Sequence, residues 1–595
     1  MLRRLKPLKP YLARYTRRYV TGFLTLIITQ AVGVTVPLII KAGIDTLTMV
    51  DTQGHLRFHP GLANAVTSNR LLMLAGLLLG VALVKAVFQF WMRWILIGIS
   101  RDVEYDLRND LFAHLMRLSQ RYYVSTRTGD LMSKLTNDLN AVRNLVGPGI
   151  MYSASTVVVM ISTVGLMLGL DWRLTLLSLV PLPLASFLVK IFGEQIHDRF
   201  ERIQAMYSEL TERVRESLSG VRVVRAFCQE EAEMAEFDRM NLEFVEKNKR
   251  LIWISSFLWP ALGLMFAIAF MLLLVIGGRH VLSGQISLGT FTAFNIYLMY
   301  LIWPIIALGW TVNLVQRGLA SLERLWTIFD SQPEIDDRGV AHPLTELRGE
   351  IEFRNLTFAY NGRPVLKNVS LRIPAGRTVA IVGATGAGKS TLVSLIPRLY
   401  EAPEGAILVD GVPIRQIPLR TLREHIGFVP QETFLFSETI RENVRFGAPA
   451  ASEAEVEHAA DVSNILPEIR EFPKAFDTLV GERGLTLSGG QKQRTAISRA
   501  VVRDPRVLIL DDALSSVDTQ TEEKILSRLS GVMQGRTTLL ISHRVSTIRH
   551  ADEIVVLHDG QIVERGTHEE LLARNGYYTE LYNKQLIEQE LEQEA

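Results

Sequence analysis

Cysteine is almost absent from this sequence: Cys228 is the single one among 595 residues. One cysteine excludes an intramolecular disulfide and a cysteine-rich metal site, and we expect it to pack as a small apolar side chain. Net charge is almost absent too, because 64 Lys and Arg stand against 62 Asp and Glu and leave a formal charge of +2. So small a charge gives no support to nucleic-acid binding, and we expect no nucleic-acid partner.

Hydrophobic side chains, by contrast, are abundant. They make up 48% of the residues, and the mean hydropathy is +0.18, which is high for a wholly soluble protein and modest for a wholly membrane-embedded one. A chain of 595 residues is also too long for a single core. These observations predict a membrane part joined to a soluble part.

Apolar runs long enough for a membrane-spanning helix, about 20 residues, lie in the first half of the chain. Roughly six meet this criterion: they start near Tyr19 and Leu71 and cover 151–170, 174–192, 257–278 and 288–310. Lys and Arg concentrate in the N-terminal stretch MLRRLKPLKPYLARYTRRYV and in the links 101–143 and 193–250, so the positive-inside tendency places these segments in the cytoplasm. The N-terminal stretch lacks a small-residue cleavage site, and we expect a retained helix that leads into the membrane.

From about residue 351 the composition changes, and short β-rich runs such as IEFRNLTFAY, TVAIVG, VLILD and TTLLIS alternate with helical stretches. This alternation is typical of an α/β domain with a largely parallel sheet. We therefore predict an all-α transmembrane domain of six spans over 1–330, a polar linker over 331–350, an α/β domain over 351–581 and an acidic tail over 582–595.

The segment VAIVGATGAGKSTL matches the pattern G-x-x-x-x-G-K-[ST] from Gly383 to Ser390, between an apolar strand and a helix. Glycine lets backbone N–H groups curl round phosphate oxygens, and the helix N-terminus adds a favourable dipole. Lys389 is expected to reach the outer phosphates of a nucleotide, and Ser390 to hold Mg²⁺. Because the strand–helix context is the one that the pattern requires, we prefer a P-loop nucleotide-binding domain to a simple glycine-rich turn.

Two further segments support this interpretation. LTLSGGQKQR stands at the start of a predicted helix, where backbone amides form an anion site. A simple helix cap would explain its serine, but not its paired glycines and glutamine. RVLILDDALSSVD supplies a buried strand whose terminal Asp511 can orient Mg²⁺ through water, opposite Ser390. The residues of the first segment are Leu487, Ser488, Gly489, Gly490 and Gln491.

Taken in this order, the three motifs closely resemble those of the nucleotide-binding domain of ABC transporters, and the six-span half resembles the exporter-type membrane domain fused to it. The segments 126–143 and 214–231 are similar to the two intracellular helical loops of such exporters. The resemblance implies a half-transporter that binds ATP and Mg²⁺ and dimerises, because each ATP lies between the phosphate loop of one domain and the LSGGQ segment of the other. Segments around 122–127 and 220–227 are expected to couple domain closure to alternating access of the spans.

The resemblance also assigns roles to single residues. Tyr360 is similar to the aromatic that stacks on adenine, and Gln431 to the glutamine that reaches Mg²⁺ and the attacking water. His543 is similar to the histidine that contacts the γ-phosphate, and Asp518 to the aspartate of the dimer interface. Without the family, a core tyrosine, a turn glutamine and a structural histidine are the alternatives. The expected phosphate loop comprises Gly383, Ala384, Thr385, Gly386, Ala387, Gly388, Lys389, Ser390 and Thr391.

Asp512 stands where family members that work as homodimers usually have Glu, which polarises the attacking water. Asp is shorter by one CH₂, and a general base needs a contact of about 2.6–3.2 Å with the group whose proton it takes. A shortened base beside an intact LSGGQ resembles the degenerate-site subunit of heterodimeric bacterial multidrug exporters, whose partner supplies Glu. We expect a weakened ATP site and a non-identical partner; the alternative is that water or a small backbone shift fills the gap.

The sequence of the membrane half gives less information about the transported compound. Lys85, Gln89 and Arg93 interrupt the second span, and ionisable groups inside a membrane usually face a cavity or a partner. Lys85 is the better candidate for the transport pathway, whereas Arg93 either joins it or reaches the membrane surface. Phe294 and Tyr297 are candidate contacts for hydrophobic cargo, although span packing and lipid contact explain them equally well. We expect ATP-driven efflux of hydrophobic or amphiphilic compounds across the bacterial cytoplasmic membrane, with a homodimeric lipid flippase or peptide exporter as the alternative.

Overall fold

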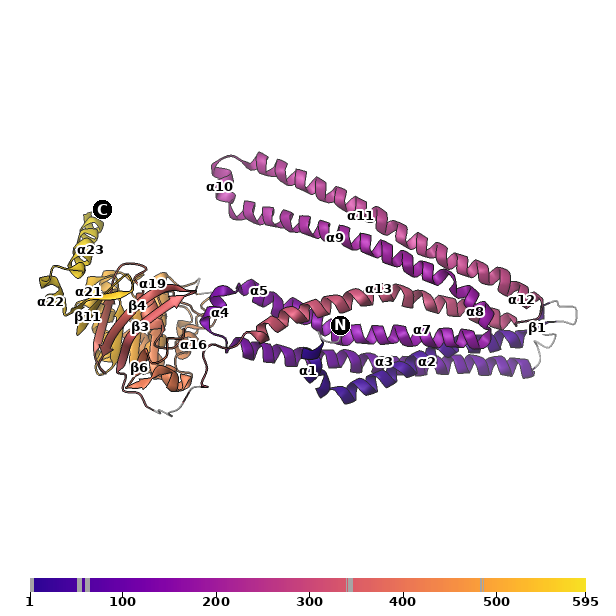
Figure 1. Ribbon diagram of the computed structural model, residues 1–595, viewed down its shortest axis with the longest axis horizontal. Coiled ribbons are helices and arrows are strands. Elements are labelled where there is room, and N and C mark those ends of the chain that lie inside the picture. The colour runs from indigo at the N-terminus through magenta and orange to yellow at the C-terminus, as the bar shows by residue number, and fades with distance from the viewer. Residues whose placement is uncertain are drawn as a thin grey trace. The chain divides into compact units, whose positions relative to one another are not determined.

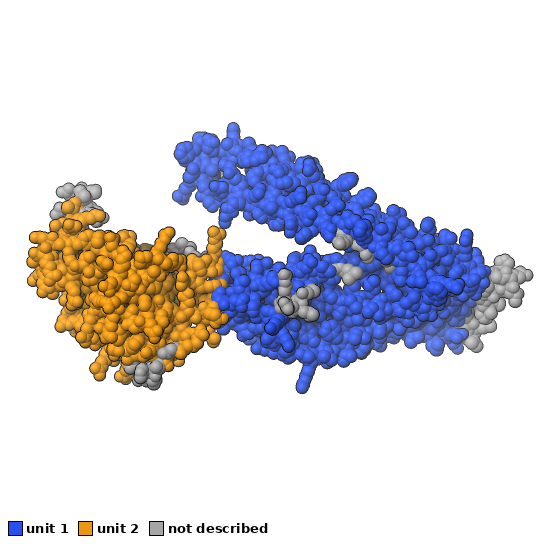
Figure 2. All heavy atoms as spheres, viewed as in Figure 1, with its two compact units in different colours: residues 1–116, 128–331 blue, residues 117–127, 332–595 orange. Residues whose placement is uncertain are grey.

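In the computed structural model, residues 5–50, 56–58, 65–338, 340, 346–481, 484 and 486–594 are described. The chain forms two compact units (Figure 2). The first unit holds Met1–Met116 and Thr128–Ser331, and the second holds Arg117–Arg127 and Gln332–Ala595. The short segment 117–127 therefore belongs to the second unit, although the sequence places it among the membrane helices.

Apart from a short hairpin and the turns between helices, the described residues of the first unit are helical. Six stretches of helix within those residues are long and apolar enough to cross a membrane, which confirms the predicted number: Thr16–Leu47, Asn69–Leu115, Thr128–Leu170, Trp172–Ser219, Glu230–Leu282 and Leu288–Asp330. The elements are α1 Lys9–Arg14, α2 Thr16–Leu47, β1 Thr48–Val50, β2 Leu56–Phe58, α3 Ala65–Leu115, α5 Thr128–Ser133, α6 Leu139–Asn144, α7 Ile150–Leu170, α8 Trp172–Leu179, α9 Pro181–Ser219, α10 Val221–Ala226, α11 Glu230–Leu272, α12 Gly278–Leu282 and α13 Leu288–Asp330.

Large apolar side chains cover the outside of these helices. Leu79 is 73% exposed and Trp94 is 66% exposed. In water this exposure would be unfavourable, whereas in the hydrocarbon of a bilayer it is the stable arrangement. Between the helices lies a buried cluster that includes Val34 of α2, Met167 of α7 and Phe266 of α11.

Helices α9 and α11 run side by side as an antiparallel pair, with the short helix α10 at their tip (Figure 1). None of the six residues of α10, all of which the structure describes, is buried. Val223 within it is 61% exposed, and Phe227 directly after it is 71% exposed. Cys228 follows, exposed and with a left-handed φ of +51°. The expectation that this cysteine packs as a core residue is therefore wrong, because it lies in the turn that leads into α11.

The described part of the second unit contains two sheets. The larger has the strand order β12-β11-β5-β10-β9-β8 and is parallel except for β12, which pairs antiparallel with β11. The smaller is antiparallel, in the order β4-β3-β6-β7. The strands are β3 Ile351–Tyr360, β4 Arg363–Ile373, β5 Thr378–Val382, β6 Ile407–Val409, β7 Val412–Pro413, β8 Ile426–Val429, β9 Val507–Asp511, β10 Thr537–Ile541, β11 Glu553–His558 and β12 Gln561–Gly566.

Helices surround these sheets and complete the predicted α/β domain. They are α4 Gln120–Ser125, α14 Lys389–Ser394, α15 Leu419–Glu424, α16 Ile440–Arg445, α17 Glu453–Val462, α18 Leu466–Glu471, α19 Gly489–Val501, α20 Thr519–Met533, α21 Val545–Ile548, α22 His568–Ala573 and α23 Tyr577–Glu594. Within the described residues, the acidic tail is thus helical from 582 to 594 and forms the second part of α23.

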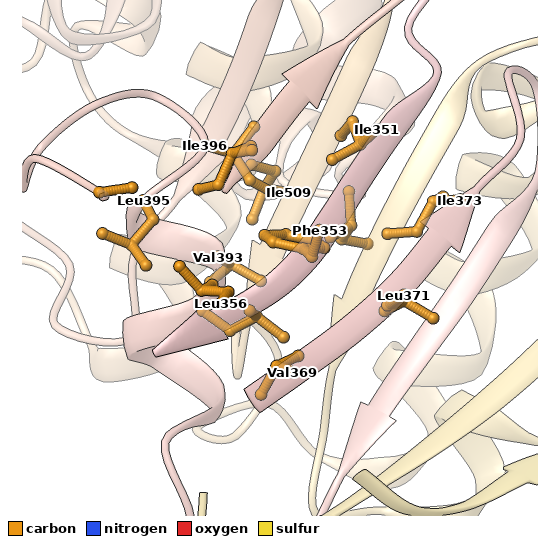
Figure 3. Packing of buried hydrophobic residues seen from close by; sticks show 14 of the residues in the cluster. Ile351, Phe353, Leu356, Val369, Leu371, Ile373, Val393, Leu395, Ile396 and Ile509 are labelled. Carbon is orange, nitrogen blue, oxygen red and sulfur yellow. The ribbon is translucent and has the colours of Figure 1, made fainter. Parts of the chain in front are cut away.

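A core of branched and aromatic side chains joins the two sheets through α14 and the residues after it (Figure 3). Alternate residues of β3 and β4 point into this core, as the period of two in a strand requires, except that one extra residue separates Phe353 from Leu356 and Leu366 from Val369. The labelled members are Ile351, Phe353, Leu356, Val369, Leu371, Ile373, Val393, Leu395, Ile396 and Ile509, each at most 3% exposed. The core therefore holds the start of α14 against the ends of β5 and β9.

The register of the parallel strands brings their carboxyl ends together. Ile541 at the end of β10 pairs with Ile381 of β5 on one side and with Asp511 of β9 on the other. In open parallel sheets, ligands bind outside the carboxyl ends of the strands. The expected phosphate loop, Asp511 and the segment after β10 all follow strands at this edge.

Candidate functional site

The loop after β5 is built from glycines that no other residue can replace without movement of the chain. Gly383 has φ +152°, and a Cβ added to it would lie 2.1 Å from the backbone oxygen of Leu557. Gly388, which precedes α14, has φ +100°, and its added Cβ would lie 2.8 Å from Cδ2 of Leu366. Because backbone and core atoms stand so close, the loop keeps the tight course that a phosphate cradle needs.

Lys389 is the first residue of α14, and its side chain turns back over the loop. The ammonium group donates hydrogen bonds to the backbone oxygens of Gly383 at 2.8 Å and Ala384 at 2.9 Å. Burial lowers the pKa of Lys389, while the carboxylates of Asp511 and Asp512 act in the opposite direction. A cation is thus held directly above the loop in which phosphates are expected.

Ser390 and Asp511 meet where α14 begins and β9 ends. The Ser390 hydroxyl donates to Oδ1 of Asp511 at 3.0 Å, and Asp511 is only 3% exposed. Burial raises the pKa of Asp511, as does the neighbouring Asp512, whereas the Ser390 hydrogen bond, Lys389 and His543 lower it. A hydroxyl and a carboxylate oxygen are hard donors of the kind that Mg²⁺ prefers, so this pair fits the ion that the sequence predicts.

The next residue, Asp512, lies in an uncommon backbone conformation. Its φ is +49°, in the left-handed region that Asp tolerates better than most residues do. Its backbone N–H donates to the backbone oxygen of Ile541 at 2.9 Å, which ties the end of β9 to that of β10. The backbone that carries this carboxylate is therefore anchored to the neighbouring strand.

Gln431 and His543 follow the strands on either side of β9. Gln431 comes after β8 and Pro430, His543 comes after β10, and both are exposed. The backbone oxygen of His543 also accepts a hydrogen bond from the Gln585 side chain of α23. Four neighbouring strands, β5, β10, β9 and β8, thus present the phosphate loop, His543, Asp512 and Gln431 along one edge of the sheet.

Tyr360, at the end of β3, lies beside the same helix start. Its ring meets those of Phe358 and Tyr400 edge to face, at centroid distances of 5.0 and 5.1 Å. Its hydroxyl lies 3.5 Å from Oγ1 of Thr391. Tyr360 and Tyr400 line a cavity of about 830 Å³, which provides an aromatic wall next to the phosphate loop.

Helix α4 forms part of that cavity, which the sequence did not indicate. Arg121 and Val124 of α4 line it together with Tyr360. Arg121 donates to Oδ1 of Asn361 at 3.2 Å and pairs with Glu334 at 3.3 Å. Arg121 carries no motif of its own, so only the tertiary structure could reveal that the predicted coupling segment lies beside the predicted adenine-stacking residue.

The LSGGQ segment caps α19. The Ser488 hydroxyl accepts a hydrogen bond from the backbone N–H of Gln491 at 3.2 Å, and the Gln491 side chain accepts one from the backbone N–H of Ser488 at 2.9 Å. Gln491 is therefore explained by a capping box, contrary to the expectation that a cap would leave it unexplained. An added Cβ on Gly490 would lie 3.0 Å from the backbone oxygen of Ser516, so this glycine permits close approach of the next loop.

Asp518 caps the following helix, α20. Its Oδ1 accepts a hydrogen bond from the backbone N–H of Thr521 at 2.9 Å, and this bond lowers the pKa of Asp518. Within the described residues, no hydrogen bond joins the segment 487–491 or Asp518 to the loop 383–391. The segment 478–484 resembles the loop by which the family's nucleotide-binding domains contact the membrane domain, and its residues Glu482 and Arg483 lie outside the described residues.

Known families match both units of the chain. The family described as the ABC transporter transmembrane region matches residues 19–305, and the family described as ABC transporter matches residues 366–515. A probable multidrug resistance ABC transporter ATP-binding/permease protein of Bacillus subtilis, YheI, is 37% identical over 588 residues, with 98% of each chain covered. The chain belongs to the ABC transporter family.

Other relatives agree on the exporter architecture. An ATP-dependent lipid A-core flippase of Syntrophus aciditrophicus is 38% identical over 515 residues, which cover 87% of this chain and 86% of the relative. A solved structure described as a bacterial Atm1-family ABC exporter with ATP bound has a TM-score of 0.78 and 29% identity, and the match covers 96% of this chain and 99% of that one. This ABC transporter is thus a half-transporter that works as a dimer: a multi-pass membrane protein with a cytoplasmic ATP-binding domain, whose ATPase is coupled to export.

The residues predicted to contact cargo in this ABC transporter lie in two different environments in the structure. Lys85 lines a cavity of about 400 Å³ between α2, α3, α7 and α13. Phe294 and Tyr297 are both 0% exposed, and the Tyr297 hydroxyl donates to the backbone oxygen of Val34 at 2.9 Å. These two aromatics therefore pack α13 against α2, away from the cavity lining, and their burial does not support a role as cargo contacts.

Proposed function

We propose that this chain is the subunit with the slower ATP site in a heterodimeric ABC exporter, in which a partner with Glu at the matching position hydrolyses ATP faster. The observation that supports the proposal is the identity of residue 512, which is Asp where family members that work as homodimers usually have Glu. The other functional side chains of the site are the ones that the family motifs require, so the weakness is confined to the general base.

The backbone of Asp512 is held by a hydrogen bond, and this limits how far a backbone shift could compensate for the shorter side chain. The alternative was a small backbone shift that advances the carboxylate. Such a shift would stretch the 2.9 Å hydrogen bond from the Asp512 N–H to the backbone oxygen of Ile541. Ile541 ends β10, a central strand of the sheet. With the backbone held, the carboxylate falls short by about one C–C bond, and a misplacement of about 1 Å can lower a rate about 10²-fold.

The remaining groups act by binding and orientation. Lys389 neutralises phosphate charge over the loop, and Ser390 with Asp511 would hold Mg²⁺, which supplies further charge neutralisation when it is bound. Gln431 and His543 are exposed on either side of Asp512, where they can orient the attacking water and contact the γ-phosphate. Slow hydrolysis with intact binding is the expected result.

Dimer formation completes the site. The segment Leu487–Gln491 presents amides at the start of α19, and we propose that it closes over the phosphate loop of the partner, with Asp518 at the interface. The exposed apolar side chains Val223 and Phe227 at the tip of the α9–α11 pair are suited to contact a nucleotide-binding domain and to transmit its closure. We propose the bacterial cytoplasmic membrane as the site of action, and hydrophobic or amphiphilic compounds as the cargo.

The test is ATP turnover by the purified full-length chain without its partner. The wild-type chain should bind ATP but hydrolyse it slowly, and Asp512→Glu should raise turnover about 10²-fold, because the added CH₂ restores the reach of the base. Rapid hydrolysis by the wild-type chain alone would contradict the proposal and would favour a homodimer.

A matched control separates catalysis from backbone strain. Asp559 has the same residue type and a similar left-handed φ, +45°, but lies in the turn between β11 and β12. Asp559→Glu should cost as much stability as Asp512→Glu, about 1 kcal/mol, and should leave ATP turnover unchanged. A gain in turnover from both variants would indicate a non-specific effect and would count against the role of Asp512.

A further inference from the structure

The cavity between α2, α3, α7 and α13 has an unusual distribution of charge. Lys85 and Arg93 of α3 are the charged members of its described lining. The sequence contains no Asp or Glu over residues 19–44 of α2, 71–101 of α3, 150–170 of α7 or 288–322 of α13. Every helix that lines the cavity is thus free of carboxylates over its apolar length. Among the residues that the structure describes, no carboxylate pairs with Lys85, which is half-buried, or with Arg93, which is exposed.

Lys85 faces inward from α3. A Cβ added to Gly33 of α2 would lie 3.2 Å from both Cε and Nζ of Lys85. The ammonium group is therefore packed against the neighbouring helix within the apolar part of the unit, and does not extend along the helix to the membrane surface. In contrast, Lys41 of α2 pairs with Asp45 at 3.2 Å, which is the usual way to stabilise a cation in such a place.

Helical spacing aligns the polar side chains of the cavity. Lys85, Gln89 and Arg93 are separated by four residues each, so they share one face of α3 and extend over about 12 Å. Gln30 of α2 donates a hydrogen bond to Ser155 of α7 at 2.5 Å, which adds polar groups opposite them. The wall thus combines cations, amides and hydroxyls.

The rest of the lining is suited to an apolar tail. Methionine and aromatic side chains occupy it, and these give a large, adaptable contact surface. They are Met92, Met151, Tyr152, Met299, Tyr300 and Trp303. An occupant that satisfies both parts of the lining has a negatively charged headgroup and a hydrophobic tail.

We propose that this cavity selects anionic amphiphiles, with Lys85 and Arg93 binding the headgroup. The proposal rests on the proposed export function and names the class of its cargo. A half-buried ammonium such as that of Lys85 is unfavourable in apolar surroundings until an anion joins it. Binding an anionic headgroup therefore relieves this charge, whereas a cationic amphiphile of equal tail length adds to it. The occupant can be a bilayer lipid or a soluble amphiphile, since both share this chemistry.

The experiment measures binding to the purified full-length chain in neutral detergent, without ATP. The probe is a dodecyl phosphate with bromine in its tail, detected by quenching of tryptophan fluorescence, and dodecyltrimethylammonium serves as the cationic competitor. We expect the phosphate to bind at least about ten-fold more tightly than the ammonium compound, which corresponds to about 1.4 kcal/mol. Lys85→Gln combined with Arg93→Gln should reduce this preference to within about two-fold.

Arg70→Gln is the matched control, because it removes a cation from the same helix at an exposed position outside the cavity lining. It should keep the wild-type preference. Unchanged or tighter binding of dodecyltrimethylammonium to the double variant will show that the cavity is still folded and has lost only its charge selectivity. Equal affinities in the wild type, or a preference that survives the double substitution, would overturn the proposal.

Two further measurements distinguish a lipid ligand from a soluble one, and a failure of the cavity's selectivity from a failure of the export function. Quenching by tail-brominated phosphatidic acid in nanodiscs points to a lipid, quenching by the soluble phosphate alone points to a soluble amphiphile, and quenching by neither overturns the proposal. Because these measurements need no ATP, selective binding without ATP-driven flux would contradict the export function and leave the cavity's selectivity intact.

Discussion

The two units of this ABC transporter stabilise their functional charges in opposite ways. In the nucleotide-binding unit, Lys389 is satisfied by two loop oxygens and Asp511 by the Ser390 hydroxyl. In the membrane unit, Lys85 and Arg93 line a cavity on helices without a carboxylate along their apolar length. The charged groups of the nucleotide-binding unit thus have partners before a ligand binds, whereas we propose that the cations of the membrane cavity obtain theirs from the ligand.

The difference reflects how each site obtains its specificity. A phosphate loop must hold one fixed chemical group, so its geometry is set by backbone contacts that leave no room for a Cβ. A cargo cavity must admit and release its ligand, so its two cations, Lys85 and Arg93, are held by helix packing and have no ion-pair partner among the described residues. Substitutions should therefore have steep effects in the nucleotide-binding unit and graded effects in the membrane unit.

The largest effect is expected at Gly383. Gly383→Ala places a Cβ 2.1 Å from the backbone oxygen of Leu557, so the loop must move, and ATP affinity should fall by at least about 10²-fold, equivalent to about 2.7 kcal/mol. Equilibrium ATP binding to the purified chain measures this. Gly362→Ala is the control: Gly362 also has a positive φ, +82°, but open space around it, so ATP binding should be unchanged. Equal losses in both variants would mean that strain, rather than the clash, explains the effect.

Asp511→Asn tests the completeness of the nucleotide site. Burial raises the pKa of Asp511 in the folded protein above its ordinary value of about 3.9, so the carboxylate destabilises the fold once the pH rises above that value. At pH 7 the variant should therefore unfold at a higher temperature than the wild type in the absence of nucleotide, and each kcal/mol corresponds to about 2–4 °C.

The pH dependence provides the control for this prediction. The gain should disappear as the pH falls below about 4, where Asp511 is protonated in both states. Mg²⁺-dependent hydrolysis should be lost at all pH values. A variant that is less stable than the wild type at pH 7 would contradict the account of Asp511 as a buried carboxylate whose charge lowers the stability of the fold.

Ser488→Ala separates a structural cap from a functional one. Loss of the capping box at α19 should cost about 1 kcal/mol of stability and should also lower hydrolysis at the partner's site in the assembled dimer. Ser452→Ala removes an equivalent capping box at α17, made with Glu455, and should cost similar stability with no change in hydrolysis. Thermal unfolding and ATP turnover of the two variants make the comparison. Equal turnover in both would assign Ser488 to the helix cap alone.

The smallest effect is expected in the membrane cavity. The added Cβ of Gly33→Ala would stand 3.2 Å from the Lys85 side chain, which is flexible enough to move by a few tenths of an ångström. The preference for anionic over cationic amphiphiles should therefore change by only about two- to three-fold, less than 1 kcal/mol. Gly165→Ala on α7, with nothing within 4 Å of its added Cβ, should change nothing. A loss of preference as large as that of the Lys85 and Arg93 double variant would break the contrast between a rigid and an adaptable site.

Sequence patterns predicted much of this molecule because they record local requirements. Six apolar runs of span length predicted six helices, and the alternation after residue 351 predicted the α/β unit. The spacing from Gly383 to Ser390 predicted a tight loop, and the structure explains its first glycine, Gly383, by a close backbone contact with Leu557. Two predictions were wrong because the sequence does not show the surroundings of a residue. Cys228 is exposed at a turn instead of packed, and Gln491 is part of a capping box.

What the sequence determined by itself, then, was the family and the order of the units. It also predicted the nucleotide-site residues, because all of these depend on short-range spacing and residue type. Only the tertiary structure decided which residues meet from distant positions. It brought Arg121 of α4 to Asn361 and Glu334, buried Phe294 and Tyr297 between helices, and turned Lys85 towards Gly33 in a cavity without carboxylates. These contacts arise from helix packing over long sequence separations, which no local pattern encodes.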